Sequence, residues 1–317
     1  MILITGGLGF IGAHTTRALL DLGADCVAVQ RGARPATAFE VELGKRVFVE
    51  QADIRDRDRL RALCERYRPT AIVHLAGSVP WPPGGADPVA DALAAVESLL
   101  RVLDVARERS IRVAVASTIG VYGGIADPGP WHEDLPLAPR ALHPIPAFKK
   151  IGELLSDHLA DTAGLDVVNL RIAGIWGPGG HPVSRFMAAP QLLHAAAHGT
   201  APELTGPLYA DDGIDLCYVK DCARAIALLA TAERLHHRVY NIGGGRHTTN
   251  AEVVHALTEL VPRFAVEIRP GHGPQPTSGT EYLAIDRLVA DTGYRPHYPV
   301  SSAAADYLAW LRAGNPR

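Results

Sequence analysis

The sequence predicts an α/β protein with a doubly wound parallel sheet and a smaller C-terminal lobe. Two observations carry this prediction. The chain opens with an apolar, β-branched strand from Ile2 to Thr5 that runs into a glycine-rich turn, and helical spacing begins at Phe10. Strands and helices then alternate as far as about residue 172, and such alternation is typical of right-handed βαβ units around a parallel sheet.

The glycine-rich turn predicts a Rossmann dinucleotide-binding site. Gly6, Gly9 and Gly12 fit the spacing G-x-x-G-x-x-G, and Gly7, Gly9 and Gly12 fit G-x-G-x-x-G. Glycine lets the backbone turn tightly and approach a pyrophosphate, while the N-terminal N–H groups of the following helix face the phosphates. The position between a strand and an amphipathic helix is the context that this motif requires.

The alternating elements divide the chain at about residue 172. We expect strands at 2–5, 25–30, 47–49, 71–75, 111–116 and 167–172, with helices from residue 10 to about 22 and at 56–66, 87–109 and 146–163. Residues 1–172 would form the dinucleotide-binding domain and 173–317 the substrate lobe, with segments around 215–242 returning to the sheet. In that lobe we expect strands at 216–219 and 239–242 and helices at 221–233 and 250–260.

The end of the second strand bears on the choice of dinucleotide. An acidic residue about 20 positions after the glycine turn would hold the adenosine ribose of NAD, but this strand ends in Gln30 and Arg31. Arg31 either meets a 2′-phosphate, which favours NADP, or stacks on adenine or faces water. Asp53 follows the third strand, where it accepts a hydrogen bond from the adenine amino group or caps the helix at 56–66.

Composition narrows the class of protein. The 317 residues are 47% apolar and 21% charged with a net charge of −3, which is typical of an ordinary soluble protein and gives no field for nucleic acid or anionic membrane. No apolar run reaches the ~20 residues of a membrane span, and the chain begins in a core strand, so we expect no signal peptide. The cysteines form no C-x-x-C pair and no metal-ligand spacing is present, so we expect buried thiols in the cytoplasm. These cysteines are Cys26, Cys64, Cys217 and Cys222.

Several short sequence blocks, in the order in which they occur along the chain, resemble the extended short-chain dehydrogenase/reductases. The resemblance is to the NAD-dependent epimerase/dehydratase family in particular, which is typified by UDP-galactose 4-epimerase. The blocks are Thr5 to Gly12, Ala52 to Ile54, His74 to Ala76, Ser117-Thr118 with Val121 to Gly123, Glu133-Asp134, Leu170-Arg171 with Gly177 to Gly179, Tyr218 to Asp221, Tyr240 to Gly243 and Gly293 to Pro296. The resemblance implies an NAD(P)-dependent enzyme that acts on a sugar, nucleotide sugar or related polyol. It also implies a homodimer that pairs through the helices near 88–108 and 146–163. The implied cofactor-binding residues are Gly6, Gly9, Phe10, Ile11, Gly12, Arg31, Asp53, Ile54, Leu75, Ala76, Gly77 and Lys149.

The catalytic residues of that family are a Ser or Thr, a Tyr and a Lys, the last two spaced Tyr-x-x-x-Lys. The matching segment from Pro144 to Glu153 places the Lys at Lys149 and puts Ile145 where the family has Tyr, while Thr118 takes the Ser/Thr position. Isoleucine cannot carry a proton, and a placed acid/base is worth ~10²–10⁴ in rate. Related nucleotide-sugar 4,6-dehydratases with Met at this position make Lys149 the first candidate base, and its alternative role is to bind ribose only. Further candidates are His143, Tyr122 and His132.

The residues expected on the substrate side also differ from the family. Gly174, Ile214 and Ala95 stand where the family has Asn, Arg and Asn, so a charge-assisted phosphate contact is missing and the site looks rebuilt for another substrate. Arg185 and Arg269 are the remaining candidates for a phosphate contact. The predicted substrate-binding residues are Ser78, Thr118, Tyr122, His143 and Arg185.

Three hypotheses follow from these features. The first is a redox-neutral epimerase or dehydratase that uses Thr118 and Lys149. The second is an NADPH-dependent reductase or a lyase acting on a small secondary metabolite, motivated by Arg31 and the lost phosphate ligands. The third is a dinucleotide-binding module without catalysis, motivated by Ile145.

Overall fold

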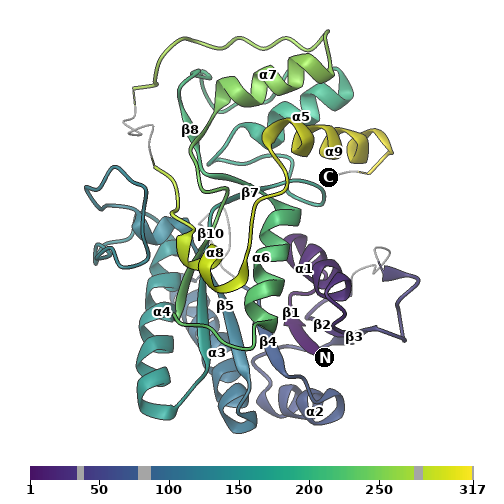
Figure 1. Cartoon of the computed structure of the whole chain (residues 1–317), viewed down its shortest axis with the longest axis vertical. Coiled ribbons are helices and arrows are strands. Elements are labelled where there is room, and N and C mark those ends of the chain that lie inside the picture. Colours follow the sequence, from purple (N-terminus) through teal and green to yellow (C-terminus); the bar gives the residue numbers. More distant parts are fainter. Residues whose placement is uncertain (34–38, 78–86, 275–280, 316–317) are drawn as a thin grey trace.

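A seven-stranded parallel sheet forms the centre of the computed structural model, which describes residues 1–33, 39–77, 87–274 and 281–315 (Figure 1). The strand order is β10-β6-β5-β4-β1-β2-β3. This architecture confirms the predicted α/β fold. The strands are β1 (Ile2–Thr5), β2 (Cys26–Gln30), β3 (Val47–Gln51), β4 (Ala71–His74), β5 (Arg112–Thr118), β6 (Val167–Ile172) and β10 (Val239–Ile242).

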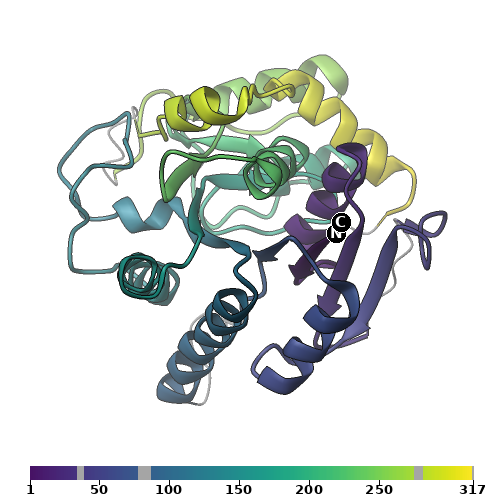
Figure 2. The ribbon, with the colours of Figure 1, turned by 60° about the horizontal axis from the view of Figure 1, so that its bottom comes forward.

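Helices cover both faces of the sheet because successive residues of a strand point to opposite sides. On β1, Ile2 and Ile4 belong to one apolar core together with Ile226, whereas Leu3 belongs to a second core together with Val102. The first face carries α1 (Phe10–Asp21) and α6 (Val219–Thr231), and the second carries α2 (Arg57–Tyr67), α3 (Pro88–Arg109) and α4 (Pro144–Ala163). Figure 2 shows these two helical layers with the sheet between them.

The sheet changes its winding direction beside β1. The chain proceeds outward from β1 to β2 and β3, and then crosses back to place β4 on the other side of β1. Thr5 pairs with Val29 on one side and with His74 on the other, so the loops after these three strands diverge at one edge. Ligands of open α/β sheets bind at such a switch point, beyond the carboxyl ends of the strands.

A smaller group of helices lies beyond this edge. A third apolar core, which includes Trp176, Leu193, Leu257 and Tyr307, is enclosed by α5 (Ala189–His198), α7 (Asn250–Leu260) and α9 (Val300–Arg312). Figure 1 shows these three helices together at the top of the molecule. Two small sheets pair β7 (Gly174–Trp176) with β9 (Leu216–Tyr218) and β8 (Gly213–Ile214) with β11 (Thr248–Thr249).

The segment 215–242 is divided between the two parts of the molecule. Its strand β10 pairs with β6 and its helix α6 packs against α1, whereas β9 pairs with β7 outside the large sheet. The remaining helix, α8 (Asp286–Thr292), packs near β10. No helix of the described chain is long and apolar enough to cross a membrane.

Candidate active site

The turn after β1 exposes backbone atoms, rather than side chains, at the carboxyl edge of the sheet. Gly6 has a φ of +73°, a conformation that glycine adopts without strain, and a Cβ on Gly12 would lie 2.1 Å from the Gly6 carbonyl oxygen. The Gly9 N–H donates to the same carbonyl at 2.8 Å. Gly9 is also the N-cap of α1 and has no side chain there. The turn is therefore narrow, and the start of α1 stays open to an anion.

A cleft of about 420 Å³ opens beside this turn, between the ends of β1, β2 and β4. It brings together most of the predicted cofactor-binding residues. These are Gly6, Gly9, Arg31, Asp53, Ile54, Leu75, Ala76 and Gly77. The glycine turn and the cleft have the lining expected for a dinucleotide, and the family resemblance predicts its phosphates at the glycine turn and its adenosine toward Arg31.

The other predicted cofactor residues lie near the cleft without lining it. Phe10 faces the loop after β7, where a Cβ on Gly180 would lie 2.9 Å from its ring, and Ile11 packs against the core of the α1 side. Gly12 closes the turn from behind. Ser78, predicted to contact substrate, lies outside the described residues.

Toward the predicted adenosine position, Asp53 does not cap a helix. Asp56 caps α2 by accepting from the Arg59 N–H at 3.0 Å, so the capping alternative considered for Asp53 is wrong. The Asp53 carboxylate instead accepts from the Arg55 guanidinium, which lowers the pKa of Asp53 to about 2. Arg31 is exposed and contributes to the same lowering. A carboxylate and two guanidinium groups thus stand where the adenosine would bind.

The predicted catalytic residues lie on β5 and α4, two elements that line a smaller cavity adjoining the cleft. Thr118 ends β5, and its hydroxyl accepts from the Gly120 N–H at 3.2 Å. Ile145 lies in the first turn of α4, and Lys149 lies one turn further along. Lys149 has no hydrogen bond or ion pair with any described residue. Burial lowers the pKa of its ammonium to about 8, against the opposing effect of Glu153.

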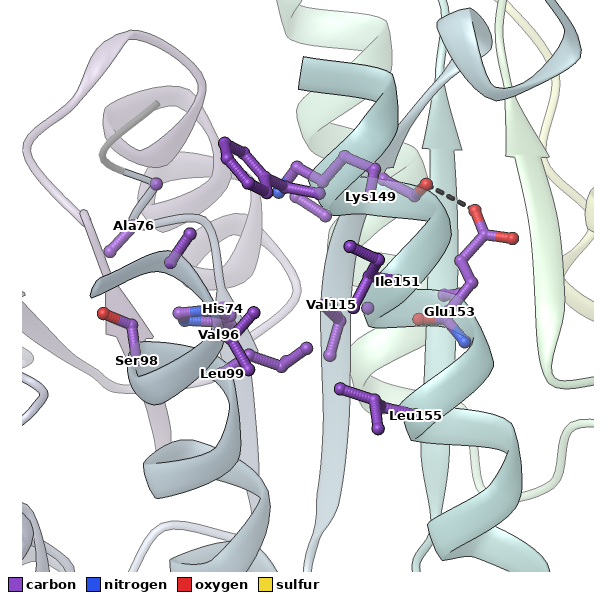
Figure 3. A pocket seen from close by; sticks show the side chains of 17 residues that line it. His74, Ala76, Val96, Ser98, Leu99, Val115, Lys149, Ile151, Glu153 and Leu155 are labelled. Atoms are coloured by element: carbon purple, nitrogen blue, oxygen red, sulfur yellow. Dashed lines mark hydrogen bonds between the residues drawn. The ribbon is translucent and has the colours of Figure 1, made fainter. Parts of the chain in front are cut away.

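A neutral histidine lies beside Lys149. The Thr5 hydroxyl accepts from the Ala76 N–H at 3.2 Å and shares a hydrogen bond with His74 Nδ1 at 2.8 Å, whose donor depends on the ring tautomer. Burial, followed by the Lys149 charge, lowers the pKa of His74 to about 3. Figure 3 shows His74 and Lys149 lining the same cavity, with Glu153 on its far side.

A buried network of hydrogen bonds joins α4 to the sheet through Glu153. Glu153 accepts a short hydrogen bond from the Ser117 hydroxyl and pairs with Arg171, whose Nη2 lies 2.8 Å from its Oε2. The Arg171 Nη1 donates to the Tyr122 hydroxyl at 2.8 Å, and this hydroxyl donates to Asn241 at 2.8 Å. The network ties β5, β6 and β10 to the helix that carries Lys149.

Tyr122 was expected beside the substrate, and the structure does not place it there. Its side chain is fully buried and stacks on Trp131 with ring centres 5.3 Å apart. Its hydroxyl is occupied by Arg171 and Asn241. Tyr122 therefore belongs to the supporting network. A charged residue inside a buried strand, as at Arg171 in β6, is the sequence signal that a buried acidic partner was needed.

The remaining candidates lie toward the smaller lobe. His143 precedes α4 and stacks on Phe186 with ring centres 5.5 Å apart, and partial burial lowers the pKa of its ring. His132 is exposed. Arg185 is exposed at the rim of a second cleft of about 480 Å³, which Ile214 also lines. Arg269 lies over the Tyr209 ring and does not line this cleft.

No group of His, Cys, Asp or Glu in the described ranges could hold a metal ion. The fold and the glycine cradle define a dinucleotide-binding α/β protein with a second cleft inside the smaller lobe. Comparison with known proteins makes this class more specific.

The model of the NAD dependent epimerase/dehydratase family matches residues 2–243. A dTDP-glucose 4,6-dehydratase from an Actinoplanes species is 30% identical, over 98% of both chains. A UDP-glucose 4-epimerase from Azospirillum brasilense is 29% identical, over 98% of this chain and 92% of its own. The crystal structure of Thermus thermophilus UDP-glucose 4-epimerase in complex with NAD is 26% identical, covers 98% of each chain and has a TM-score of 0.77.

The chain belongs to the NAD-dependent epimerase/dehydratase family. It is accordingly an enzyme that uses a nicotinamide dinucleotide, and the resemblance inferred from its sequence blocks is confirmed at the level of the family.

Proposed function

We propose that the protein carries out a redox-neutral epimerisation or dehydration of a nucleotide sugar, or of a related sugar or polyol, in a site that lacks the family Tyr. The relatives named as a dTDP-glucose dehydratase and a UDP-glucose epimerase support this reaction class. When bound, NAD(P) supplies the hydride acceptor. The chain supplies Thr118 to orient the reacting oxygen, and Lys149 to bind the cofactor and move the proton.

The observation that carries this proposal is the state of Lys149. Its ammonium has no acidic partner in contact, and burial lowers its pKa to about 8. Near neutral pH a fraction of such a lysine is the free amine, which accepts a proton where the side chain of Ile145 cannot. His74 stays neutral beside it and so adds no second cation.

The second cleft is the proposed substrate site. It lies between the start of α5 and the strands β8 and β11, and Arg185 at its rim is the available cation for an anionic group. His143 does not line this cleft but stacks on Phe186, which does. We propose Thr118, His143 and Arg185 as substrate contacts, and Ser78 on the resemblance alone.

For the cofactor we propose NADP over NAD, because Arg31 and Arg55 both line the adenosine end and no acidic residue ends β2. NAD is the nucleotide bound in the Thermus thermophilus structure. Titration with both nucleotides decides the preference. Arg31→Ala should weaken NADP binding by about tenfold while NAD binding changes little, as expected for one lost charge-assisted contact.

We also propose a homodimer through α3 and α4. Both helices expose apolar side chains at helical spacing, and the two helices pack against each other. The residues are Val89, Leu93 and Leu100 on α3 with Ile151 and Leu154 on α4. Sedimentation should give a dimer, and Leu93→Glu combined with Leu154→Glu should give a monomer. A cytoplasmic location is proposed on the four buried free thiols.

The function is tested with purified protein, its co-purifying nucleotide, and UDP-glucose or dTDP-glucose as substrate. Product formation without net NADPH consumption supports an epimerase or dehydratase, and Lys149→Ala should abolish it. Stoichiometric NADPH consumption would instead indicate the reductase. Nucleotide binding without any product from a panel of sugars would indicate a module without catalysis.

A further inference from the structure

An inner chamber of about 50 Å³ lies between α3, α4 and the strands β4, β5 and β6. Much of its wall is apolar, including Val96, Leu99, Val115, Ile151 and Leu155, and six polar residues interrupt it (Figure 3). The polar lining residues are His74, Ser98, Ser117, Lys149, Glu153 and Asn169. The chamber adjoins the dinucleotide cleft, since three residues line both: Ala76, Gly77 and Ser98.

Asn169 has no place in the network already described. It is the third residue of β6 and is 1% exposed, yet neither Oδ1 nor Nδ2 of its carboxamide bonds to any described residue. Asn241 on the neighbouring strand β10 instead uses both side-chain atoms. Buried amides almost always bond to protein or to ordered water, and this carboxamide has no bond to a described protein group, so ordered water is the expected partner.

No described protein group in the chamber forms a hydrogen bond with the Asn169 carboxamide. The Glu153 carboxylate is engaged by Ser117 and Arg171. Lys149 also lines the chamber, and its ammonium, which has three N–H donors, bonds to no described residue. The lining thus includes an amide with both donor and acceptor and a lysine without a protein partner.

The size of the chamber matches water. A buried water needs about 10–15 Å³ of such volume and two to four polar partners, so the chamber has room for roughly three or four. A larger polar ligand does not fit in about 50 Å³.

We propose that the inner chamber is a permanent water site, in which ordered waters bound by the Asn169 carboxamide extend to the Lys149 ammonium and hydrate it from behind. Asn169 is then a positioning residue that acts on Lys149 through water and touches no reacting atom. This inference is independent of the proposed reaction, because it concerns the protein without nucleotide or substrate.

The test is a high-resolution crystal structure of the protein without added nucleotide, together with the pKa of Lys149 measured from ¹⁵N-labelled lysine side chains and assigned with Lys149→Ala. We expect water density within hydrogen-bond distance of both Asn169 side-chain atoms. In Asn169→Leu, which has a similar volume, these waters should be lost and the Lys149 pKa should fall by about one unit, since the ammonium loses solvation.

Ser156→Ala is the matched control. Ser156 is a buried polar residue of α4 whose hydroxyl donates to the Gly152 carbonyl at 2.7 Å, and it does not line the chamber. This variant should keep both the waters and the Lys149 pKa. The proposal is overturned if the wild-type chamber is dry, or if Asn169→Leu leaves the Lys149 pKa unchanged. If Asn169→Leu does not fold, the wild-type density alone decides.

Discussion

The Thr5 hydroxyl and the His74 imidazole meet at 2.8 Å across the two strands where the sheet changes direction. The same hydroxyl accepts from the Ala76 N–H, so Thr5 holds both the imidazole ring and the start of the loop that lines the dinucleotide cleft. His74 is therefore buried beside the site in its uncharged form, which makes the stability of the fold depend on pH.

We predict that His74 makes the protein acid-sensitive. Its pKa falls from 6.5 to about 3 in the folded state, so between these pH values the unfolded chain binds a proton that the native chain does not. Stability therefore decreases as pH drops below about 6.5, by up to ~1.4 kcal/mol per pH unit. In His74→Gln, urea unfolding between pH 7 and pH 5 should show a shallower loss. His132→Gln, at an exposed ring, should keep the wild-type slope, and an unchanged slope in both variants would contradict the prediction.

The glycine cradle gives a second prediction. A Cβ on Gly12 would lie 2.1 Å from the Gly6 carbonyl oxygen, which is backbone and cannot move aside without distorting the turn. Gly12→Ala should therefore lower the melting temperature and weaken nucleotide binding by at least tenfold. Gly23→Ala serves as a control for stability alone, because its φ of +84° makes alanine strained while no atom lies within 4 Å of the added Cβ. Unaltered nucleotide affinity in folded Gly12→Ala would show that the turn does not hold the phosphates.

Sequence reasoning succeeded where local pattern and tertiary structure agree. The strand Val167–Ile172 and the helix Asn250–Leu260 have the predicted bounds, because each is marked by apolar spacing and clear ends. The strand β7 was missed because only three residues pair, within a Gly/Pro-rich stretch, and its partner β9 lies about forty residues away. Helices α5 and α9 were missed because the third core that orders them is assembled from distant segments.

Some features of the site could likewise be predicted from local sequence, and others could not. The residues of the glycine turn are adjacent in sequence, so their spacing alone predicts the cradle. The contact between Thr5 and His74, or between Ser117 and Glu153, depends on which strands become neighbours, and no spacing in the chain encodes it. Tyr122 lies in a motif that reads as functional, yet its burial is decided by Trp131 and Asn241, which come from elsewhere in the chain.

The ion pair between Glu153 and Arg171 gives a third prediction. Both side chains are less than a tenth exposed, so removing one partner leaves the other charge buried without compensation. Arg171→Met should destabilise the fold by ~3–5 kcal/mol, whereas the double variant Arg171→Met with Glu153→Gln should recover part of that loss. Denaturant unfolding of the wild type, of Arg171→Met and Glu153→Gln alone and of the double variant measures the coupling. A loss in the double variant equal to the sum of the two single losses would mean that the two charges act independently.

The last prediction separates the two roles assigned to Lys149. If its amine takes the proton that Tyr handles elsewhere in the family, turnover requires the deprotonated form and should rise with pH until it levels off above about 8, the pKa set by burial. Lys149→Arg keeps the positive charge but cannot deprotonate near neutral pH. It should therefore retain most nucleotide affinity while turnover falls by ~10²–10⁴. A Lys149→Arg enzyme with near-normal turnover would leave Lys149 as a cofactor ligand only, and the proton would then have to be carried by another group, of which His143 is the first to test.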